Sequence, residues 1–300
     1  ALKSDTCRAP GELGLQLYEH RRPGEDFSSA PHSVASVLSA GGISASYVCK
    51  CNHQEPHIIK DYWLDWLDED AKWSLIGELS DICQTINQKI GIRPMVPNQW
   101  WPDADRFNVS MPSNRELSRE ISLREAVVGK AKLKPARIRK ILLDLARQIE
   151  ELHNLGGKYY HGALDPETIY LTKKLKVSIV EPPRIRSRLM ELSKRILIPM
   201  HTYIAPEQFK KEPSRASDCY SLGKIAYFML YGCDPESVVH IDHWAAFSGD
   251  LHVIDEIIRK TTTTDATQRP SIFQLVEWLA GQSLLLESEP LALGSLTDDL

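Results

Sequence analysis

Two kinds of hydrophobic pattern divide the chain into a first and a second part. In the first part, short runs of β-favouring residues are separated by glycines and polar residues, which is typical of strands. The expected strands are 34–38, 47–51 and 57–60, with a turn at 40–42. From residue 134 onward, apolar residues such as Ile138, Ile141 and Leu145 recur at helical spacing. The pattern predicts an α+β protein in two lobes, the first rich in strands and the second in helices.

One long helix is expected in the first part and several in the second. Residues 67–90 carry apolar side chains at helical spacing from Trp73 to Ile86, after an acidic stretch that suits a helix N-terminus. Pro135 stands near the start of a helix that ends at Gly156-Gly157. Further helices are expected over 217–231, 252–260 and 272–279. No strand is assigned within 94–112.

The same pattern gives the expected domain organisation. We expect an irregular arm over 1–32, a first lobe over 33–118, a second lobe over 119–283 and a flexible acidic tail over 284–300.

Composition narrows the class of protein. The chain has 300 residues, 42% of them hydrophobic, and a formal net charge of −4, so composition favours a globular chain and neither a nucleic-acid nor a membrane partner. No stretch approaches the roughly 18 uninterrupted apolar residues of a membrane span. The six cysteines form no CxxC pair, which favours reduced thiols and no zinc site. We therefore expect a soluble, cytoplasmic protein.

One motif in the second part carries a resemblance to a known family. Residues 161–171 read HGALDPETIYL. This stretch resembles the catalytic loop of protein kinases, whose pattern is HRDLxPENI followed by a hydrophobic strand. Other motifs follow in family order: the helix end at 152–156, the strand at 176–180, YIAPE at 203–207, DCYSLG at 218–223 and Arg269-Pro270. The chain is thus similar to the protein kinase-like superfamily, which implies a bilobal kinase-like fold.

The positions that the resemblance assigns to chemistry carry other residues. Kinases use an aspartate to accept the substrate proton and an asparagine to hold magnesium, and these positions are Ala163 and Thr168 here. Asp165 stands where the family has a cation near the transferred phosphate. The second magnesium motif, DFG in the family, is Glu181-Pro182-Pro183. The resemblance therefore implies a pseudokinase, not an enzyme, with no metal and no cofactor.

The positions with an architectural role in the family are retained. His161 matches a packing and hydrogen-bonding residue, and Asp218 matches the residue that binds the catalytic-loop backbone. Glu207 and Arg269 match a buried ion pair that holds the activation segment. The residues that carry catalysis in the family are replaced, while those that hold the fold are kept, and this combination favours a pseudokinase.

A vestigial nucleotide pocket is implied in the first lobe. Residues 38–47 resemble the glycine-rich loop of kinases and include Gly41 and Gly42, but serines replace two of its glycines and hinder the approach of phosphate. Lys60 matches the strand lysine and Glu78 its ion-pair partner; the alternative is a surface lysine and a solvated helix acid. ATP binding is expected to be weak or absent.

Partner binding is the activity that remains. Arg184, Arg186 and Arg188 open the activation-segment region and are predicted to contact a protein partner, with a solvated face as the alternative. The expected function is a protein-binding scaffold or an allosteric regulatory subunit. Two other functions stay open: a non-kinase transferase or nucleotide-binding regulator on the same fold, and a nucleic-acid-associated structural protein that uses its basic clusters.

Overall fold

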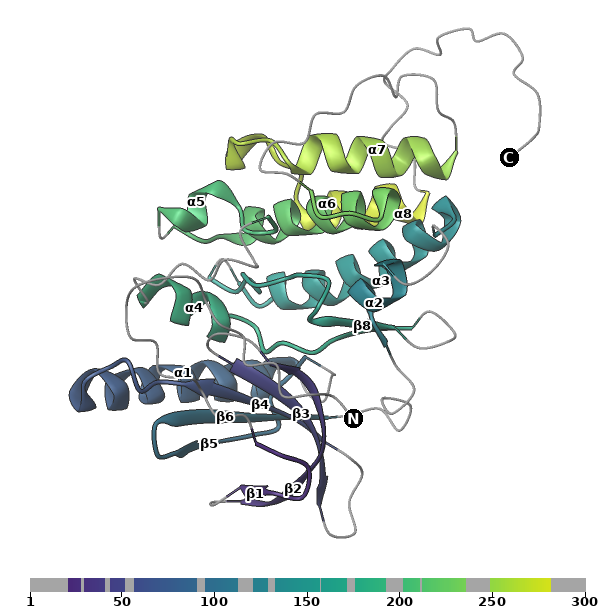
Figure 1. Ribbon diagram of the computed structural model, residues 1–300. Helices are drawn as coiled ribbons and strands as arrows, with labels where there is room; N and C mark the ends of the chain where they lie inside the picture. Colours follow the sequence, from purple (N-terminus) through teal and green to yellow (C-terminus); the bar gives the residue numbers. More distant parts are fainter. Residues whose placement is uncertain are drawn as a thin grey trace, which may run out of the picture.

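The computed structural model has two lobes, as Figure 1 shows. It describes residues 21–27, 30–40, 44–51, 57–90, 95–112, 121–128, 133–156, 158–171, 176–192, 202–210, 212–235 and 249–281. The smaller lobe holds a six-stranded sheet and the helix α1, and the larger lobe holds the remaining helices and a small sheet. The predicted α+β arrangement in two lobes is confirmed.

The sheet of the first lobe is antiparallel throughout. Its strand order is β1-β2-β3-β4-β6-β5. The strands are β1 (Asp26–Phe27), β2 (Ala30–Ala40), β3 (Ser44–Cys51), β4 (His57–Trp63), β5 (Gln99–Asp103) and β6 (Arg106–Pro112). The three predicted strands are present and longer than expected. β5 and β6 occupy the region without an assignment, and β1 and the start of β2 lie within the arm that was expected to be irregular.

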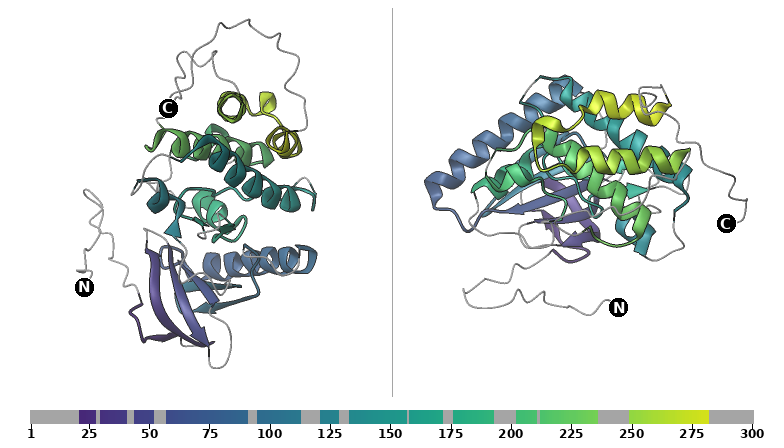
Figure 2. Two further views of the ribbon diagram at one scale, coloured as in Figure 1. Left: turned by 90° about the vertical axis from the view of Figure 1, so that its right-hand side faces the viewer. Right: turned by 90° about the horizontal axis from the view of Figure 1, so that it is seen from above.

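Both faces of this sheet are covered, which explains why its strands read as short apolar runs. On β4, Ile58 and Tyr62 face the cluster that contains α1, whereas Ile59 and Trp63 face a second cluster with Phe27. The helix α1 (Glu69–Ile90) packs its buried face against the sheet (Figure 2, left). Trp73, expected on the core face of this helix, is 56% exposed instead.

The second lobe is built around the helix α3. Its elements are β7 (Ile121–Ser122), α2 (Leu123–Val128), α3 (Pro135–His153), β8 (Ile169–Leu171), β9 (Val177–Ile179), α4 (Ile185–Leu192), α5 (Pro206–Phe209), α6 (Arg215–Tyr231), α7 (Asp250–Thr261), a 3-10 turn (Ala266–Gln268) and α8 (Ile272–Ala280). α3 packs against α6, α7 and α8 (Figure 2, right). The four predicted helices are confirmed, whereas α2, α4 and α5 were not predicted.

One apolar cluster continues from the first lobe into the second, and it includes Tyr62 on β4 and Ile141 on α3. The two lobes therefore share a hydrophobic core, and residues of both lobes surround the polar side chains that lie between them. No helix in the described part of the chain is long and apolar enough to cross a membrane. Cys49, Cys83, Cys219 and Cys233 carry free thiols.

Candidate functional site

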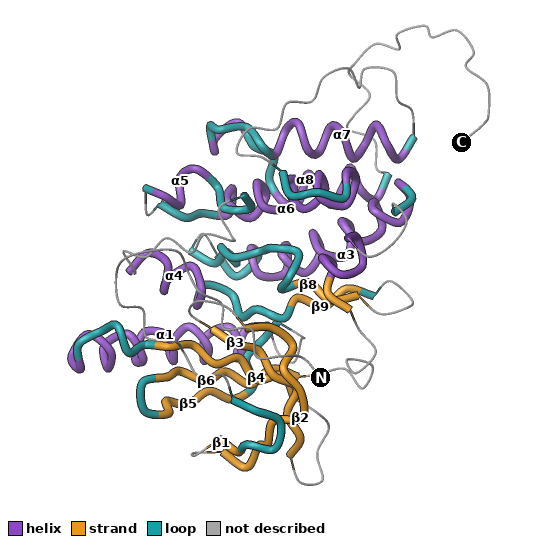
Figure 3. The backbone as a smooth tube through the Cα atoms, in the orientation of Figure 1, coloured by secondary structure: helices purple, strands orange, loops and turns teal. Residues whose placement is uncertain are grey.

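The candidate site lies between the lobes, where β4, the loop before β8, the chain after β9 and the helix α4 meet (Figure 3). These elements contribute two cations and two carboxylates. We call Lys60, Asp165, Glu181 and Arg186 the four-charge cluster. Each of the four side chains is buried or mostly buried, with Arg186 the most exposed at 16%.

Glu181 is the centre of this cluster. Its side chain is fully buried and forms an ion pair with the Lys60 ammonium through Oε2. The Tyr62 hydroxyl donates to Oε1 at 2.5 Å. Burial and the neighbouring Glu181 carboxylate raise the pKa of Tyr62, which keeps its hydroxyl protonated as a donor. Both carboxylate oxygens of Glu181 are therefore occupied.

Asp165 is occupied in the same way. Its Oδ1 accepts from the backbone N–H groups of Glu167 at 2.7 Å and Thr168 at 3.0 Å. Its Oδ2 accepts from Arg186 Nη1 at 2.9 Å. The Thr168 hydroxyl donates to the Asp165 carbonyl at 3.0 Å and so closes the turn. The loop is held by its own side chains.

Arg186 joins the two carboxylates. The same Nη1 that binds Asp165 lies 3.8 Å from Glu181 Oε2. Burial acts to lower the pKa of the Arg186 guanidinium, but the Asp165 and Glu181 carboxylates outweigh it and the pKa is raised. Burial lowers the pKa of the Lys60 ammonium, and Glu181 opposes that shift. Two cations face two anions, so the cluster has no net charge.

Ala163 offers no acid–base group at the position where the resemblance expects the catalytic aspartate. It is 3% exposed and packs against Ile204. The preceding Gly162 has φ +75°, and a Cβ there would lie 2.8 Å from Ser187 on α4. Gln208 Nε2 donates to the Gly162 carbonyl at 2.9 Å. This part of the loop is packed from two sides.

His161 and Asp218 support the loop from beneath. Asp218 accepts from the backbone N–H groups of His161 and Gly162, each at 2.7 Å, and from His153 Nε2 at 2.8 Å. His161 Nε2 donates to the Glu181 carbonyl at 2.9 Å, and its Nδ1 accepts from the Ala163 N–H at 3.3 Å. Burial lowers the pKa of His161, so the ring is neutral with its proton on Nε2. Its role here is structural.

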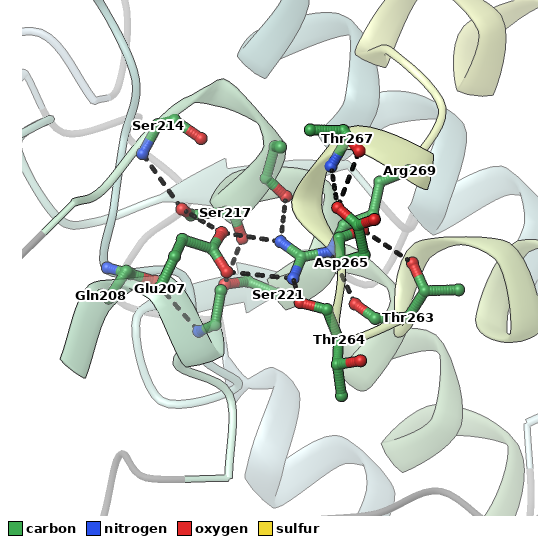
Figure 4. Close-up of polar contacts among 12 residues, drawn as sticks. Glu207, Gln208, Ser214, Ser217, Ser221, Thr263, Thr264, Asp265, Thr267 and Arg269 are labelled. Atoms are coloured by element: carbon green, nitrogen blue, oxygen red, sulfur yellow. Dashed lines mark hydrogen bonds and ion pairs between the residues drawn. The ribbon is translucent and has the colours of Figure 1, made fainter. Parts of the chain in front are cut away.

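The ion pair predicted between Glu207 and Arg269 is present (Figure 4). Two hydrogen bonds of 2.7 and 3.0 Å join the guanidinium to the two carboxylate oxygens. Ser217 Oγ donates to Glu207 at 2.7 Å, and Arg269 also binds the backbone carbonyls of Thr263 and Ala216. This pair ties the end of the activation segment to α6 and to the turn before α8.

One predicted pairing differs in the structure. Glu78 does not bind Lys60, whose partner is Glu181; it accepts instead from Arg188 Nε at 2.8 Å. The reason is that Glu181 reaches Lys60 from the second lobe, while α4 places Arg188 beside α1. Gly41 and Gly42 lie outside the described residues.

The three arginines predicted to bind a partner are used within the molecule. Arg186 belongs to the four-charge cluster, and Arg188 binds Glu78 and Glu191. Arg184 is half-buried and its guanidinium lies 5.3 Å from the centre of the Tyr160 ring. In this arrangement the guanidiniums of Arg186 and Arg188 are engaged and do not form a free basic surface.

Comparisons with known proteins give a match by structure only. No protein-family model matches the sequence, and no curated protein does. A crystal structure of the Mycobacterium tuberculosis PknI kinase domain superimposes with a TM-score of 0.64, covering 88% of this chain and 100% of that one at 15% identity. A second structure of that domain gives a TM-score of 0.65 at 14% identity, covering 88% and 99%. The fold is that of a protein kinase domain.

Protein kinase domains use magnesium, and the carboxylates of the four-charge cluster, as they are paired here, do not fit a magnesium site. Magnesium takes oxygen ligands in a near-octahedral shell at about 2.0–2.1 Å. Here every carboxylate oxygen of Asp165 and Glu181 already accepts from a protein donor. Within the described ranges, no group of three or more His, Cys, Asp or Glu side chains is placed to hold a metal ion.

Proposed function

We propose that this chain is a pseudokinase: a kinase-fold domain that does not transfer phosphate and acts as a protein-binding scaffold or a regulatory subunit. The observation that carries the proposal is Ala163, a buried methyl group packed on Ile204 at the position of the general base. A methyl group cannot accept the proton of a substrate hydroxyl.

The charges around Ala163 support the same proposal. Phosphoryl transfer depends on cations that face the transferred phosphate and stabilise its charge. Lys60 is engaged by Glu181, and Asp165 adds a carboxylate where a phosphate would need a cation. Losing the base alone lowers a rate by about two to four powers of ten.

A regulatory or scaffolding role follows from what the domain keeps. Asp218 still anchors the loop backbone, and Glu207 with Arg269 still holds the end of the activation segment. These contacts maintain the fold without serving chemistry. A kinase fold maintained in this way acts through its surface, so we propose protein partners for it.

Phosphate transfer is the direct test. Purified wild-type protein is incubated with radiolabelled ATP and magnesium or manganese, with a generic protein substrate, and mass spectrometry follows any other transferred group, such as adenylyl or glutamyl. No incorporation is expected, in the wild type or in Lys60→Ala. Incorporation by the wild type that disappears both in Lys60→Ala and in Glu181→Ala would contradict the proposal.

A further inference from the structure

The four-charge cluster contains a cation that belongs to the chain itself. Arg186 lies between two carboxylates. It is 2.9 Å from Asp165, in the loop that resembles the kinase catalytic loop, and 3.8 Å from Glu181, in the motif that corresponds to DFG. A carboxylate pair at such a junction needs a positive charge between its members, because two buried like charges destabilise each other. Arg186 supplies that charge from α4.

The surroundings of α4 explain how the arginine reaches this place. Arg184 adopts φ +67°, and its N–H donates to the His161 carbonyl at 3.0 Å, which turns the chain after the two prolines. Ile185 and Leu189 are buried on one side of the helix. Arg186 then points to the second lobe's loop, while Arg188 binds Glu78 on α1 of the first lobe. α4 therefore holds both lobes through two arginines.

We propose that Arg186 takes the place of the divalent metal of this fold, so that α4 and both lobes are held closed without metal or nucleotide. The inference deepens the proposed function and rests on it. A divalent ion added to the neutral cluster would leave two unpaired positive charges in a buried place, which is unfavourable. A protein of this kind would keep its partner-binding shape whatever the nucleotide concentration.

The test replaces Arg186 by a neutral side chain of similar shape. Arg186→Gln leaves Lys60 against two carboxylates, so the cluster gains a net charge of −1 and becomes attractive to divalent cations. We expect hydrogen exchange of the amides in 185–192 to be faster by about tenfold or more than in the wild type. Added magnesium or calcium chloride should slow this exchange and raise the melting temperature of the variant, while potassium chloride of equal ionic strength should not.

Arg184→Gln is the matched control, because it removes the same charge from the same segment and Arg184 binds no carboxylate among the described residues. This control and the wild type should show no response to divalent cations. The double variant Arg186→Gln/Asp165→Asn restores net neutrality, so its melting temperature should lose the cation response while its α4 amides still exchange faster than in the wild type.

Several results would overturn the inference. They are stabilisation of the wild type by magnesium, exchange in Arg186→Gln no faster than in Arg184→Gln, and a cation response that persists in the double variant. If Arg186→Gln does not fold, the double variant carries the test, and its failure to fold would also count against the inference, because neutrality would then not be what the cluster requires. If magnesium changes neither the exchange nor the melting temperature of the wild type, but the wild type incorporates phosphate, only the proposed function is contradicted.

Discussion

At the scale of single residues, the ion pair of Glu207 and Arg269 shows how a buried charge is kept. Burial acts to raise the pKa of Glu207, but hydrogen bonds from Arg269 and Ser217 outweigh it and the pKa is lowered. A lowered folded-state pKa stabilises the fold above the ordinary pKa near 4.5. That stabilisation is lost as the pH falls below 4.5 and through the folded-state pKa.

Replacing one partner of this pair is expected to destabilise the protein strongly. Glu207→Ala strands the Arg269 guanidinium, whose side chain is 0% exposed, at a cost of about 3 kcal/mol. Denaturant unfolding at pH 7 measures the loss, and the gap from the wild type should shrink as the pH falls below 4.5. Glu212→Ala is the control, because Glu212 is exposed. Equal stability of the two variants would contradict the assignment of a buried pair.

At the scale of elements, two apolar residues of α1 that were assigned to the same helical pattern differ in their burial. Leu79 is 0% exposed between the helix and the sheet, whereas Trp73 is 56% exposed. Residues follow one another by roughly 100° around a helix, so Trp73 lies about 120° from Leu79. The buried face of the first turns is made by Lys72, Leu75 and Ile76, and Trp73 lies outside it.

Alanine substitutions on α1 should therefore differ in cost. Leu79→Ala is expected to destabilise the protein by about 2–5 kcal/mol, because it leaves a cavity in the core. Trp73→Ala should change stability by less than about 1 kcal/mol. Thermal and urea unfolding of both variants check this. A large loss of stability in Trp73→Ala would place this side chain in an interface or core that the fold does not account for.

At the scale of the whole molecule, ion pairs between side chains of the two lobes hold the lobes together. Lys60 of the first lobe binds Glu181 of the second, and Glu78 of the first binds Arg188 of the second. In a nucleotide-dependent kinase fold, the ligand contributes to this closure. Here two ion pairs between protein side chains connect the lobes.

Magnesium and ATP are accordingly expected to leave the melting temperature of the wild type unchanged. A ligand at a hundredfold excess over its Kd raises the stability of the folded state by about 2.7 kcal/mol, which thermal shift detects easily. The measurement uses millimolar ATP with magnesium, and magnesium alone as the control. A rise of several degrees with the nucleotide, absent in Lys60→Ala, would show that a nucleotide pocket is present.

Much of the fold was determined by the sequence alone. Hydrophobic periodicity located α1, α3, α6, α7 and α8 and three strands, because such patterns depend on residues close in the chain. The motif order from residue 161 to Arg269 indicated the kinase-like fold and predicted the Glu207–Arg269 pair. β5 was missed because two adjacent tryptophans and a proline hide its alternation, and α4 because it is short and contains two arginines. β6 does alternate, with Phe107, Val109 and Met111 apolar, and this signal could have located it.

The pairing of the buried charges was decided only by the tertiary structure. Lys60 lies 121 residues before Glu181, and local patterns carry no information on which cation meets which carboxylate. A buried charge binds whichever opposite charge the packing of the lobes brings within reach, since leaving it unpaired costs several kcal/mol. The sequence therefore determined which residues, Ala163 and Thr168 among them, stand in the loop that resembles the kinase catalytic loop, and the packing of α4 determined that Arg186 pairs with Asp165 beside Glu181.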